Sequence, residues 1–172
     1  DTVETAGYVT RLKDWGCRYW EVALEAHGKG PPLPFDAVLV VDRSGSMGSG
    51  PGSPMEYAKE AASWFAGEVL RANPENQVAV VSFGLEGAKH PLFPLRVGDL
   101  NADTNVDIGF SSDLEKVQSA IESLYTHGGT NTQAGFLKAL QLMTTARRNS
   151  KRVIVLLTDG VPTVSIGFPY GP

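Results

Sequence analysis

The sequence has one cysteine, Cys17, among its 172 residues, so no disulfide can form within the chain. This argues against a small disulfide-rich secreted scaffold but does not exclude a cell-surface protein. No apolar run approaches the about 20 residues that a membrane-spanning helix needs. Lysine and arginine form no cluster and the net charge is −4, which argues against a nucleic-acid-binding surface. The opening DTVETAGYVT has neither the basic start nor the apolar stretch of a signal peptide.

What the chain does have is 42% hydrophobic residues, enough for one packed domain with a small appendage. Residues 18–27, RYWEVALEAH, alternate between apolar and polar, which predicts a half-buried strand in an antiparallel pairing. The stretch 28–34, GKGPPLP, is typical of a linker. We therefore expect residues 1–34 to be a β segment of an adjoining β-rich module plus linker, and residues 35–172 to form a second domain.

From residue 35 onward, Val-rich apolar runs alternate with helical periodicity, which predicts parallel strands covered on both faces. Capping boxes at Ser53 with Glu56 and at Ser112 with Glu115 mark two helix starts. The prolines of 90–96 suit an edge strand, and GDLNADTNVDIGF (98–110) is interpreted as a loop. The prediction is a doubly wound, mostly parallel, Rossmann-like α/β sheet flanked by helices. Its predicted strands are 36–42, 77–83, 90–96 and 152–158, and its predicted helices are 54–71, 112–124 and 131–147.

Acidic and hydroxyl side chains gather where the predicted strands end. Asp42 ends the strand AVLVVD and Asp159 ends VIVLLTD, at the sheet edge where open α/β folds bind ligands. Asp42, Ser44 and Ser46 follow the spacing D-x-S-x-S, so alternate residues of a turn can face one point. Thr130, in HGGTNT, adds a further hydroxyl at a helix start. An all-oxygen set of this kind suits Mg²⁺, Mn²⁺ or Ca²⁺ and not Zn²⁺.

Other interpretations of the same residues stay open at this point. Ser-Gly clusters after strands are commonly plain turns. A G-x-S-x-G nucleophile elbow would need glycine where Ser44 stands, and no phosphate-binding P-loop occurs. An aspartyl phosphotransferase could start with Asp42, but it would place a second aspartate at 44. We expect Arg43 to point away from the cluster into solvent, and His127 to hydrogen-bond within its loop.

The segments DRSGSM, GGTNT and LLTDG together resemble the metal-ion-dependent adhesion site of von Willebrand factor A domains, over residues 35 to 165. The resemblance implies that Ser44, Ser46 and Thr130 contact the ion directly or through one water. It implies that Asp42 and Asp159 hold the ion largely through water and hydrogen bonds. The remaining position would take an acidic group from a partner, and Mg²⁺ is the first candidate ion.

The layout of YWEVALEAHGKG, DAVLVVDRSGSM and VIVLLTDGVPT resembles Gram-positive pilus-tip and surface adhesins, whose A domain is carried on β-sandwich modules. This implies an extracellular, cell-wall or pilus protein that binds host or matrix proteins and contacts other pilus or surface domains. Such adhesins often carry lysine–asparagine isopeptide cross-links, for which Lys13 or Lys29 is the candidate lysine here. Such domains have further strands after the one ending at Asp159, so we expect the carboxyl-terminal part of the sheet in a segment beyond Pro172 or in another chain.

Two alternative functions remain at the level of sequence. One is an intracellular von Willebrand factor A scaffold in a chelatase-like assembly, against which the amino-terminal β segment and linker argue. The other is a hydrolase or phosphotransferase using Asp42, for which no activating base is evident. The leading hypothesis is a metal-dependent adhesion module that is not an enzyme.

Overall fold

The computed structural model describes residues 4–11, 20–27, 33–84, 88–89, 96–160 and 162–166. The chain separates into two compact units, Asp1–Leu33 and Pro34–Pro172, and each is described by itself. No helix in the described part of the chain has the length and apolar character needed to cross a bilayer.

The first unit is an antiparallel pair of strands, β1 (Glu4–Arg11) and β2 (Trp20–His27). Glu4 lies opposite His27, and Arg11 lies opposite Trp20. This confirms the strand predicted from the alternation of 18–27 and its antiparallel pairing. Its partner β1 was not assigned from the sequence. Both candidate isopeptide lysines and most of the predicted linker lie outside the described residues, and the sandwich-like module stays a prediction.

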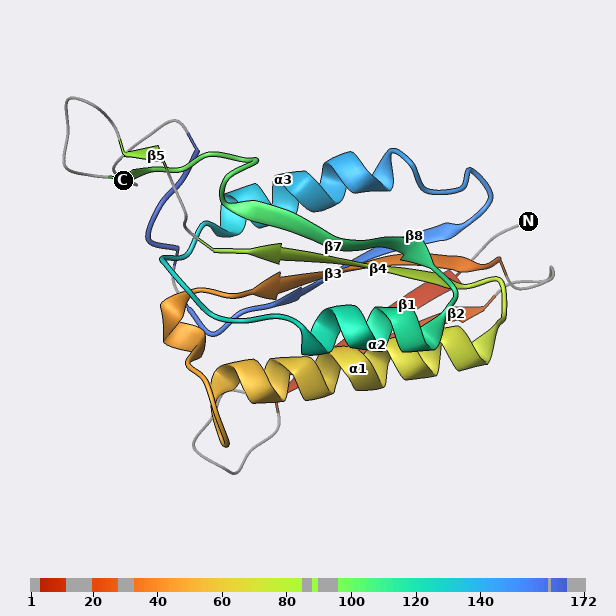
Figure 1. The fold of residues 1–172 in the computed structure, drawn as a ribbon. Coiled ribbons are helices and arrows are strands. Elements are labelled where there is room, and N and C mark those ends of the chain that lie inside the picture. The colour runs from red at the N-terminus through yellow and green to blue at the C-terminus, as the bar shows by residue number, and fades with distance from the viewer. Residues whose placement is uncertain are drawn as a thin grey trace. The chain divides into compact units, whose positions relative to one another are not determined.

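The second unit is built on a four-stranded sheet with the order β7-β4-β3-β8 (Figure 1). Its three Val-rich strands, β3 (Phe35–Asp42), β4 (Gln77–Phe83) and β8 (Lys151–Leu157), run parallel, as predicted. β3 and β4 are almost wholly buried because both of their faces are covered. The fourth strand, β7 (Thr104–Ser111), pairs antiparallel with β4 at one edge.

Helices cover both faces of this sheet. Figure 1 shows α1 (Pro54–Ala72) and α2 (Leu114–Glu122) on one face and α3 (Thr132–Met143) on the other. The core is accordingly split into two clusters, one between the sheet and α1 with α2, the other between the sheet and α3. Odd-numbered residues of β3 contribute to the first cluster and even-numbered ones to the second, as strand pleating requires. The predicted doubly wound α/β fold is confirmed.

The start of α1 agrees with the prediction from the sequence, and the start of α2 differs from it. The Ser53 hydroxyl accepts a hydrogen bond from the amide of Glu56 at 3.2 Å, as the capping box predicts. At α2, however, the cap is Asp113 and not Ser112, because the Asp113 carboxylate accepts from the amide of Lys116 at 3.2 Å.

The third helix is shorter than predicted. It ends at Met143, four residues before the predicted end at 147, because the Thr144 and Thr145 hydroxyls bond back to carbonyls of the last turn. Arg147 then turns away to meet Asp36 in β3.

The interpretation of 98–110 as a loop is wrong for its second half, which forms β7. The pairing of β7 with β4 shifts register between Val78 and Val80 and again between Val80 and Val81. As a result Ile108 packs in one core cluster and Phe110 in the other, although strict alternation would place both on one face. The irregular edge strand therefore lacks the simple alternation by which strands are recognised.

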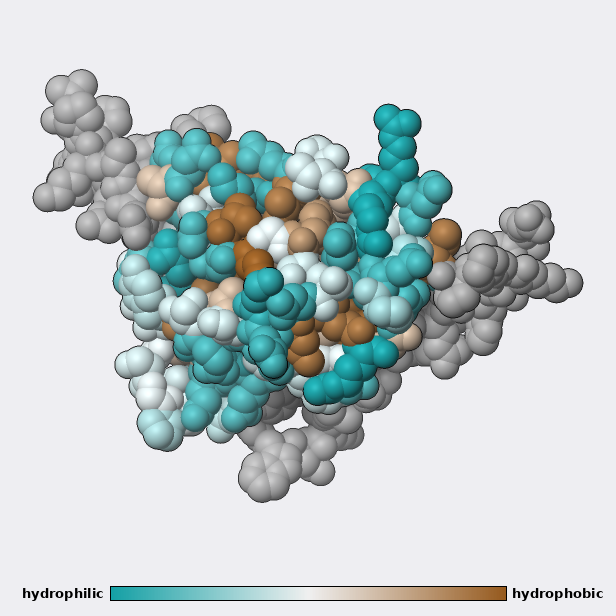
Figure 2. All heavy atoms as spheres, turned by 45° about the vertical axis from the view of Figure 1, so that its right-hand side comes forward, coloured by the Kyte–Doolittle hydropathy of each residue, from teal (hydrophilic) through white to brown (hydrophobic). Residues whose placement is uncertain are grey.

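The remaining short strands are β5 (Ala88–Lys89) and β6 (Arg96–Val97), which pair antiparallel. Most of the predicted edge strand at 90–96 lies outside the described residues, so that prediction stays open. On the face of the molecule seen in Figure 2, apolar side chains appear as separate patches among hydrophilic ones. The α3 side chains of Phe136, Leu137 and Leu140 are among the exposed apolar residues.

Candidate metal site at the carboxyl edge of the sheet

The turn after β3 carries the first three predicted ligands. Asp42 is fully buried at the end of the strand, and its Oδ1 accepts from the Ser44 amide at 2.8 Å. The chain then forms the short 3-10 helix η1 (Gly45–Met47), whose Met47 is buried in the core. Because Met47 anchors the turn, Ser46 faces outward and is exposed while Ser44 is 1% exposed.

The fourth predicted ligand comes from the neighbouring strand β8. Because β3 and β8 are adjacent and parallel, their carboxyl ends meet, which brings Asp159 beside the β3 turn. Thr158 donates from its hydroxyl to Asp42 Oδ2 at 2.6 Å. Both oxygens of the buried Asp42 therefore accept from neutral donors. Thr158 was not among the predicted site residues, although it stands next to Asp159 in LLTDG.

A chain of oxygen atoms joins the two strand ends. The Oγ atoms of Ser44 and Ser46 are 3.0 Å apart, and the Ser46 hydroxyl donates to Asp159 Oδ1 at 3.1 Å. Two adjacent ligands of an octahedral ion with bonds of 2.0–2.1 Å are separated by about 3.0 Å. The Ser44 and Ser46 oxygens are therefore spaced like two adjacent ligands of such an ion, and Asp159 is hydrogen-bonded to one of them.

Thr130 lies in the α2–α3 loop, which passes against the same turn. The Gly45 amide donates to the carbonyl of Gly128 at 2.8 Å, and a Cβ on Gly45 would approach that carbonyl to 3.3 Å. Thr130 is 3% exposed, and Thr163 holds its backbone from both sides. The Thr163 amide donates to the Thr130 carbonyl at 2.9 Å, and its hydroxyl accepts from the Thr130 amide at 2.9 Å. No sequence signal marks Thr163, because the contact is purely tertiary.

A second buried contact fixes the start of α3, directly after Thr130. Asn131 is fully buried, and its Oδ1 accepts from the amide of Ala134 at 3.1 Å. Its Nδ2 donates to Asp103 Oδ2 at 2.8 Å, and Asp103 is also fully buried. The Thr130 loop is thus tied to the helix cap on one side and to Thr163 on the other.

The donor set fits a hard divalent cation. Within the described residues, no three His, Cys, Asp or Glu side chains gather in a way that could hold a metal. The predicted site instead combines the Asp42 and Asp159 carboxylates with the hydroxyls of Ser44, Ser46 and Thr130. Such oxygen donors suit Mg²⁺, Mn²⁺ or Ca²⁺. The structure brings four of the five side chains into one hydrogen-bonded group and sets the loop of Thr130 against it.

Arg43 differs from expectation. It points away from the cluster, as predicted, but it is 7% exposed and not solvated, because it lies beside the segment that follows α2. Its guanidinium contacts Nε2 of His127 and lies 5.9 Å from the ring centroid of Tyr125. The His127 amide donates to the Arg43 carbonyl at 2.7 Å, so His127 does hydrogen-bond within the loop region. Arg43 is buried because the α2–α3 loop folds over it.

The chain is similar in sequence to known proteins. Among curated proteins, the minor fimbrium subunit Mfa5 of Porphyromonas gingivalis is 29% identical over 147 residues, covering 84% of this chain and 10% of that protein. The inter-alpha-trypsin inhibitor heavy chain H4 of Sus scrofa is 30% identical over 138 residues, covering 77% of this chain and 13% of that protein. The chain thus spans only a small part of the length of these relatives.

Solved structures give the same fold. The vWF domain of the type V pili tip protein Mfa5 from Porphyromonas gingivalis superposes with a TM-score of 0.62 at 24% identity, covering 77% of this chain and 40% of that one. The pilus adhesin RrgA from Streptococcus pneumoniae gives 0.59 at 20% identity, covering 94% of this chain and 25% of that one. The family model for the von Willebrand factor type A domain matches residues 37–161. The chain therefore belongs to the von Willebrand factor type A domain family.

Proposed function

We propose that this chain contributes a metal-dependent adhesion module to an extracellular cell-wall or pilus protein. Its relatives include a minor fimbrium subunit and structures described as pilus-tip or pilus adhesin proteins. Since the chain spans 10% of the fimbrial relative, other pilus or surface domains are proposed as its neighbours. The proposed binding partner is a host or matrix protein that presents an acidic residue to the ion.

The observation that carries this proposal is the oxygen chain from Ser44 through Ser46 to Asp159. The 3.0 Å between the Ser44 and Ser46 oxygens is compatible with two adjacent ligands of one small divalent ion such as Mg²⁺. Hydroxyl ligands leave the charge of the ion poorly neutralised. An ion held in this way gains from a further carboxylate, which is the proposed role of the partner.

Ser44 and Ser46 are better suited to binding an ion than to acting as nucleophiles in hydrolysis. Activation of a serine needs an adjacent base, usually a histidine. The only histidine described near the turn, His127, directs its ring at Arg43 and Tyr125. We therefore propose a non-enzymatic role over a hydrolase or phosphotransferase based on Asp42. The pilus relatives favour the surface adhesin over the chelatase-like scaffold.

Thermal unfolding with Mg²⁺, Mn²⁺, Ca²⁺ or EDTA tests the ion site, using the chain and its Asp159→Ala variant. Ion at 100 times its Kd stabilises the folded state by about 2.7 kcal/mol, which corresponds to a Tm rise of about 5–10 °C. We expect this rise in the unmodified chain and its loss in the variant.

Asp113→Ala is the matched control. It also removes an aspartate, but one that caps the start of α2 and is not among the predicted ion ligands. It should lower Tm in all conditions and leave the ion response intact. The absence of any ion effect in the unmodified chain would overturn the metal site. If the ion binds, surface plasmon resonance over immobilised extracellular matrix proteins, with and without EDTA, tests adhesion. Binding that persists in EDTA would contradict a metal-bridged mechanism.

A further inference from the structure

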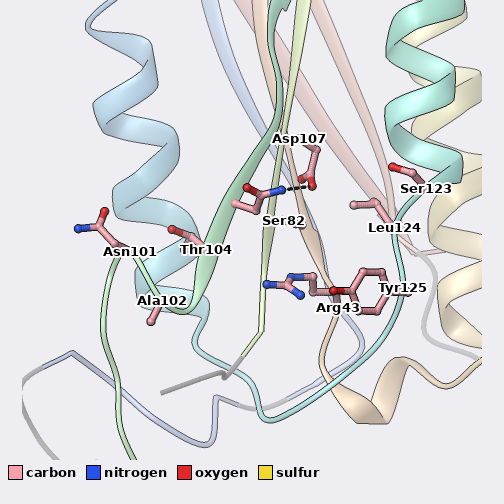
Figure 3. A pocket seen from close by; sticks show the side chains of 10 residues that line it. Arg43, Ser82, Asn101, Ala102, Thr104, Asp107, Ser123, Leu124 and Tyr125 are labelled. Carbon is pink, nitrogen blue, oxygen red and sulfur yellow. Dashed lines mark hydrogen bonds between the residues drawn. The ribbon is translucent and has the colours of Figure 1, made fainter. Parts of the chain in front are cut away.

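A polar pocket of about 320 Å³ opens beside the candidate metal site, on the α2 side of the sheet. Figure 3 shows it between the end of β4, the start of β7 and the segment that follows α2. Arg43, which stands between Asp42 and Ser44 in sequence, directs its guanidinium into this space and not into the metal site. The lining of the pocket includes Arg43, Ser82, Asn105, Asp107 and Tyr125.

Two buried oxygen atoms of this pocket are poorly hydrogen-bonded, although the Ser82 hydroxyl lies close enough to Asp107 to lower the pKa of that carboxyl. Ser82 is 1% exposed, and neither its Oγ nor Oδ2 of Asp107 makes a well-formed hydrogen bond to any described residue. The other carboxylate oxygen of Asp107 accepts from Asn105 Nδ2 at 2.7 Å (Figure 3). A buried polar atom left without a partner costs about 1–3 kcal/mol, so such atoms in a cavity indicate a bound polar group.

The pocket offers a positive group close to a negative one. Burial raises the pKa of Asp107, and the Ser82 and Asn105 side chains and the Arg43 charge oppose this effect only in part. The Arg43 guanidinium contacts the ring nitrogen Nε2 of His127 and lies over the ring of Tyr125. The two formal charges cancel, so the pocket has no preference for a net cation or anion. It presents hydrogen-bond donors and acceptors a short distance apart.

An aromatic ring stands at the rim of the pocket. Tyr125 is 66% exposed, although it packs at 5.5 Å between ring centroids on His127 and under the Arg43 guanidinium. His127 and Arg43 thus keep this large ring in place while much of it stays open to solvent. Such a ring can pack against the C–H face of a ligand that hydrogen-bonds deeper in the pocket.

We propose that this pocket binds a neutral, hydroxyl-rich ligand, one sugar ring of a glycan. A hydroxyl can donate to Asp107 Oδ2 while it accepts from Arg43 or Ser82, so neighbouring hydroxyls satisfy both kinds of group at once. The volume lies at the small end of the about 300–1,000 Å³ of ligand pockets, which suits a single ring. A neutral ligand also enters without the desolvation cost of a second buried charge.

This inference goes beyond the proposed metal site and does not depend on it. None of the pocket-lining residues is among the five predicted ion ligands. Sugar binding is therefore expected in EDTA as well as in Mg²⁺. Failure of either proposal leaves the other standing.

The test is a two-dimensional ¹H–¹⁵N NMR titration of the full chain with methyl glycosides of galactose, glucose, mannose and N-acetylglucosamine, in EDTA. Glycine serves as a zwitterionic probe. At least one glycoside should give saturable shifts at 101–107 and 123–127, with a Kd around the millimolar range. If no glycoside shifts these amides saturably, the proposal is wrong. It is also wrong if only glycine does so, because that would indicate an amino-acid site.

Two variants test whether the ligand binds in the pocket or through non-specific contact elsewhere. Tyr125→Ala removes the exposed ring without touching the core and should raise the Kd about 3- to 10-fold. Asp107→Asn keeps the shape but adds a donor where an acceptor is needed, and should raise the Kd about tenfold. Tyr57→Ala removes a half-exposed tyrosine of α1 and should change nothing. Equal binding by the Tyr125→Ala, Asp107→Asn and unmodified chains would overturn the proposal.

Discussion

The two ends of β3 each carry a fully buried aspartate, and the two are satisfied in different ways. Asp36, at the amino end, receives hydrogen bonds from the Arg147 guanidinium and from the Ser150 hydroxyl at 2.7 Å. Asp42, at the carboxyl end, receives them from the Ser44 amide at 2.8 Å and the Thr158 hydroxyl at 2.6 Å. The described residues place a cation at the first carboxylate and only neutral donors at the second.

This difference separates a structural aspartate from one suited to bind an ion. At Asp36 the chain supplies its own cation, which links β3 to the segment after α3. At Asp42 the donors orient the carboxylate but leave its charge to be compensated from outside. A buried charge is tolerated only when it is paired or coordinates an ion, so the carboxyl end of β3 is the one suited to a metal.

Replacing Asp42 with Asn gives the largest expected effect. The amide keeps the size of the carboxylate and an acceptor for the Ser44 amide, while it removes the charge that attracts the ion. In EDTA the free energy of unfolding should change by less than about 1 kcal/mol. In Mg²⁺ at 100 times the Kd, the variant should lack the about 2.7 kcal/mol of ion stabilisation. Urea unfolding in both buffers measures this, and an unchanged Mg²⁺ increment would remove Asp42 from the site.

Asp36→Asn should give the opposite pattern. It breaks the pair with Arg147, whose side chain is 36% exposed and can regain water, so the loss is smaller than for a fully buried pair. The free energy of unfolding should fall by about 2 kcal/mol, equally in EDTA and in Mg²⁺. The same urea titrations apply. A loss confined to Mg²⁺ would mean that the two ends of β3 are coupled.

Lowering the pH should reduce the free energy of unfolding, because Asp36 at the amino end of β3 becomes protonated. Burial alone would raise the pKa of Asp36, but the hydrogen bonds from Arg147 and Ser150 and the Arg147 charge bring it below its usual value. Between the folded pKa and the unfolded value of about 3.9, the unfolded chain binds more protons, so stability falls as pH falls through this range. Unfolding measured from pH 6 to 2 should show a shallower acid loss in Asp36→Asn. Parallel curves for the two proteins would contradict this role.

The smallest expected changes in stability come from removing one hydroxyl donor from each buried aspartate, Thr158 at Asp42 and Ser150 at Asp36. Thr158→Val leaves one oxygen of the buried Asp42 without its donor and should cost about 1–2 kcal/mol in EDTA. Ser150→Ala at Asp36 should cost about 0.5–1 kcal/mol, because Arg147 still satisfies that carboxylate. Thermal unfolding of the two variants side by side tests the order. The reverse order would mean that Asp42 is satisfied by groups other than Thr158.

Most of the fold could be predicted because the parallel strands form unbroken Val-rich runs, of which β3 and β4 are buried on both faces. The edge strand β8 keeps the same apolar run although it is only partly buried. The edge strand β7 could not, because its register shifts against β4 remove the alternation that marks a strand. The α2 cap was misplaced by one residue for a local reason: Ser112 and Asp113 are both good capping residues, and only the backbone geometry selects Asp113.

The sequence by itself determined which residues could bind an ion, since D-x-S-x-S after a buried strand sets Asp42, Ser44 and Ser46 within one turn. The tertiary structure alone decided that Asp159 meets them, because this depends on β8 lying beside β3. It also decided that Thr163 holds the Thr130 loop and that Arg43 is buried beside Asp107 and Tyr125. The local hydrophobic pattern of the sequence indicates which residues are buried and which strands are parallel. Contacts between distant segments arise only when the strands take their order in the sheet.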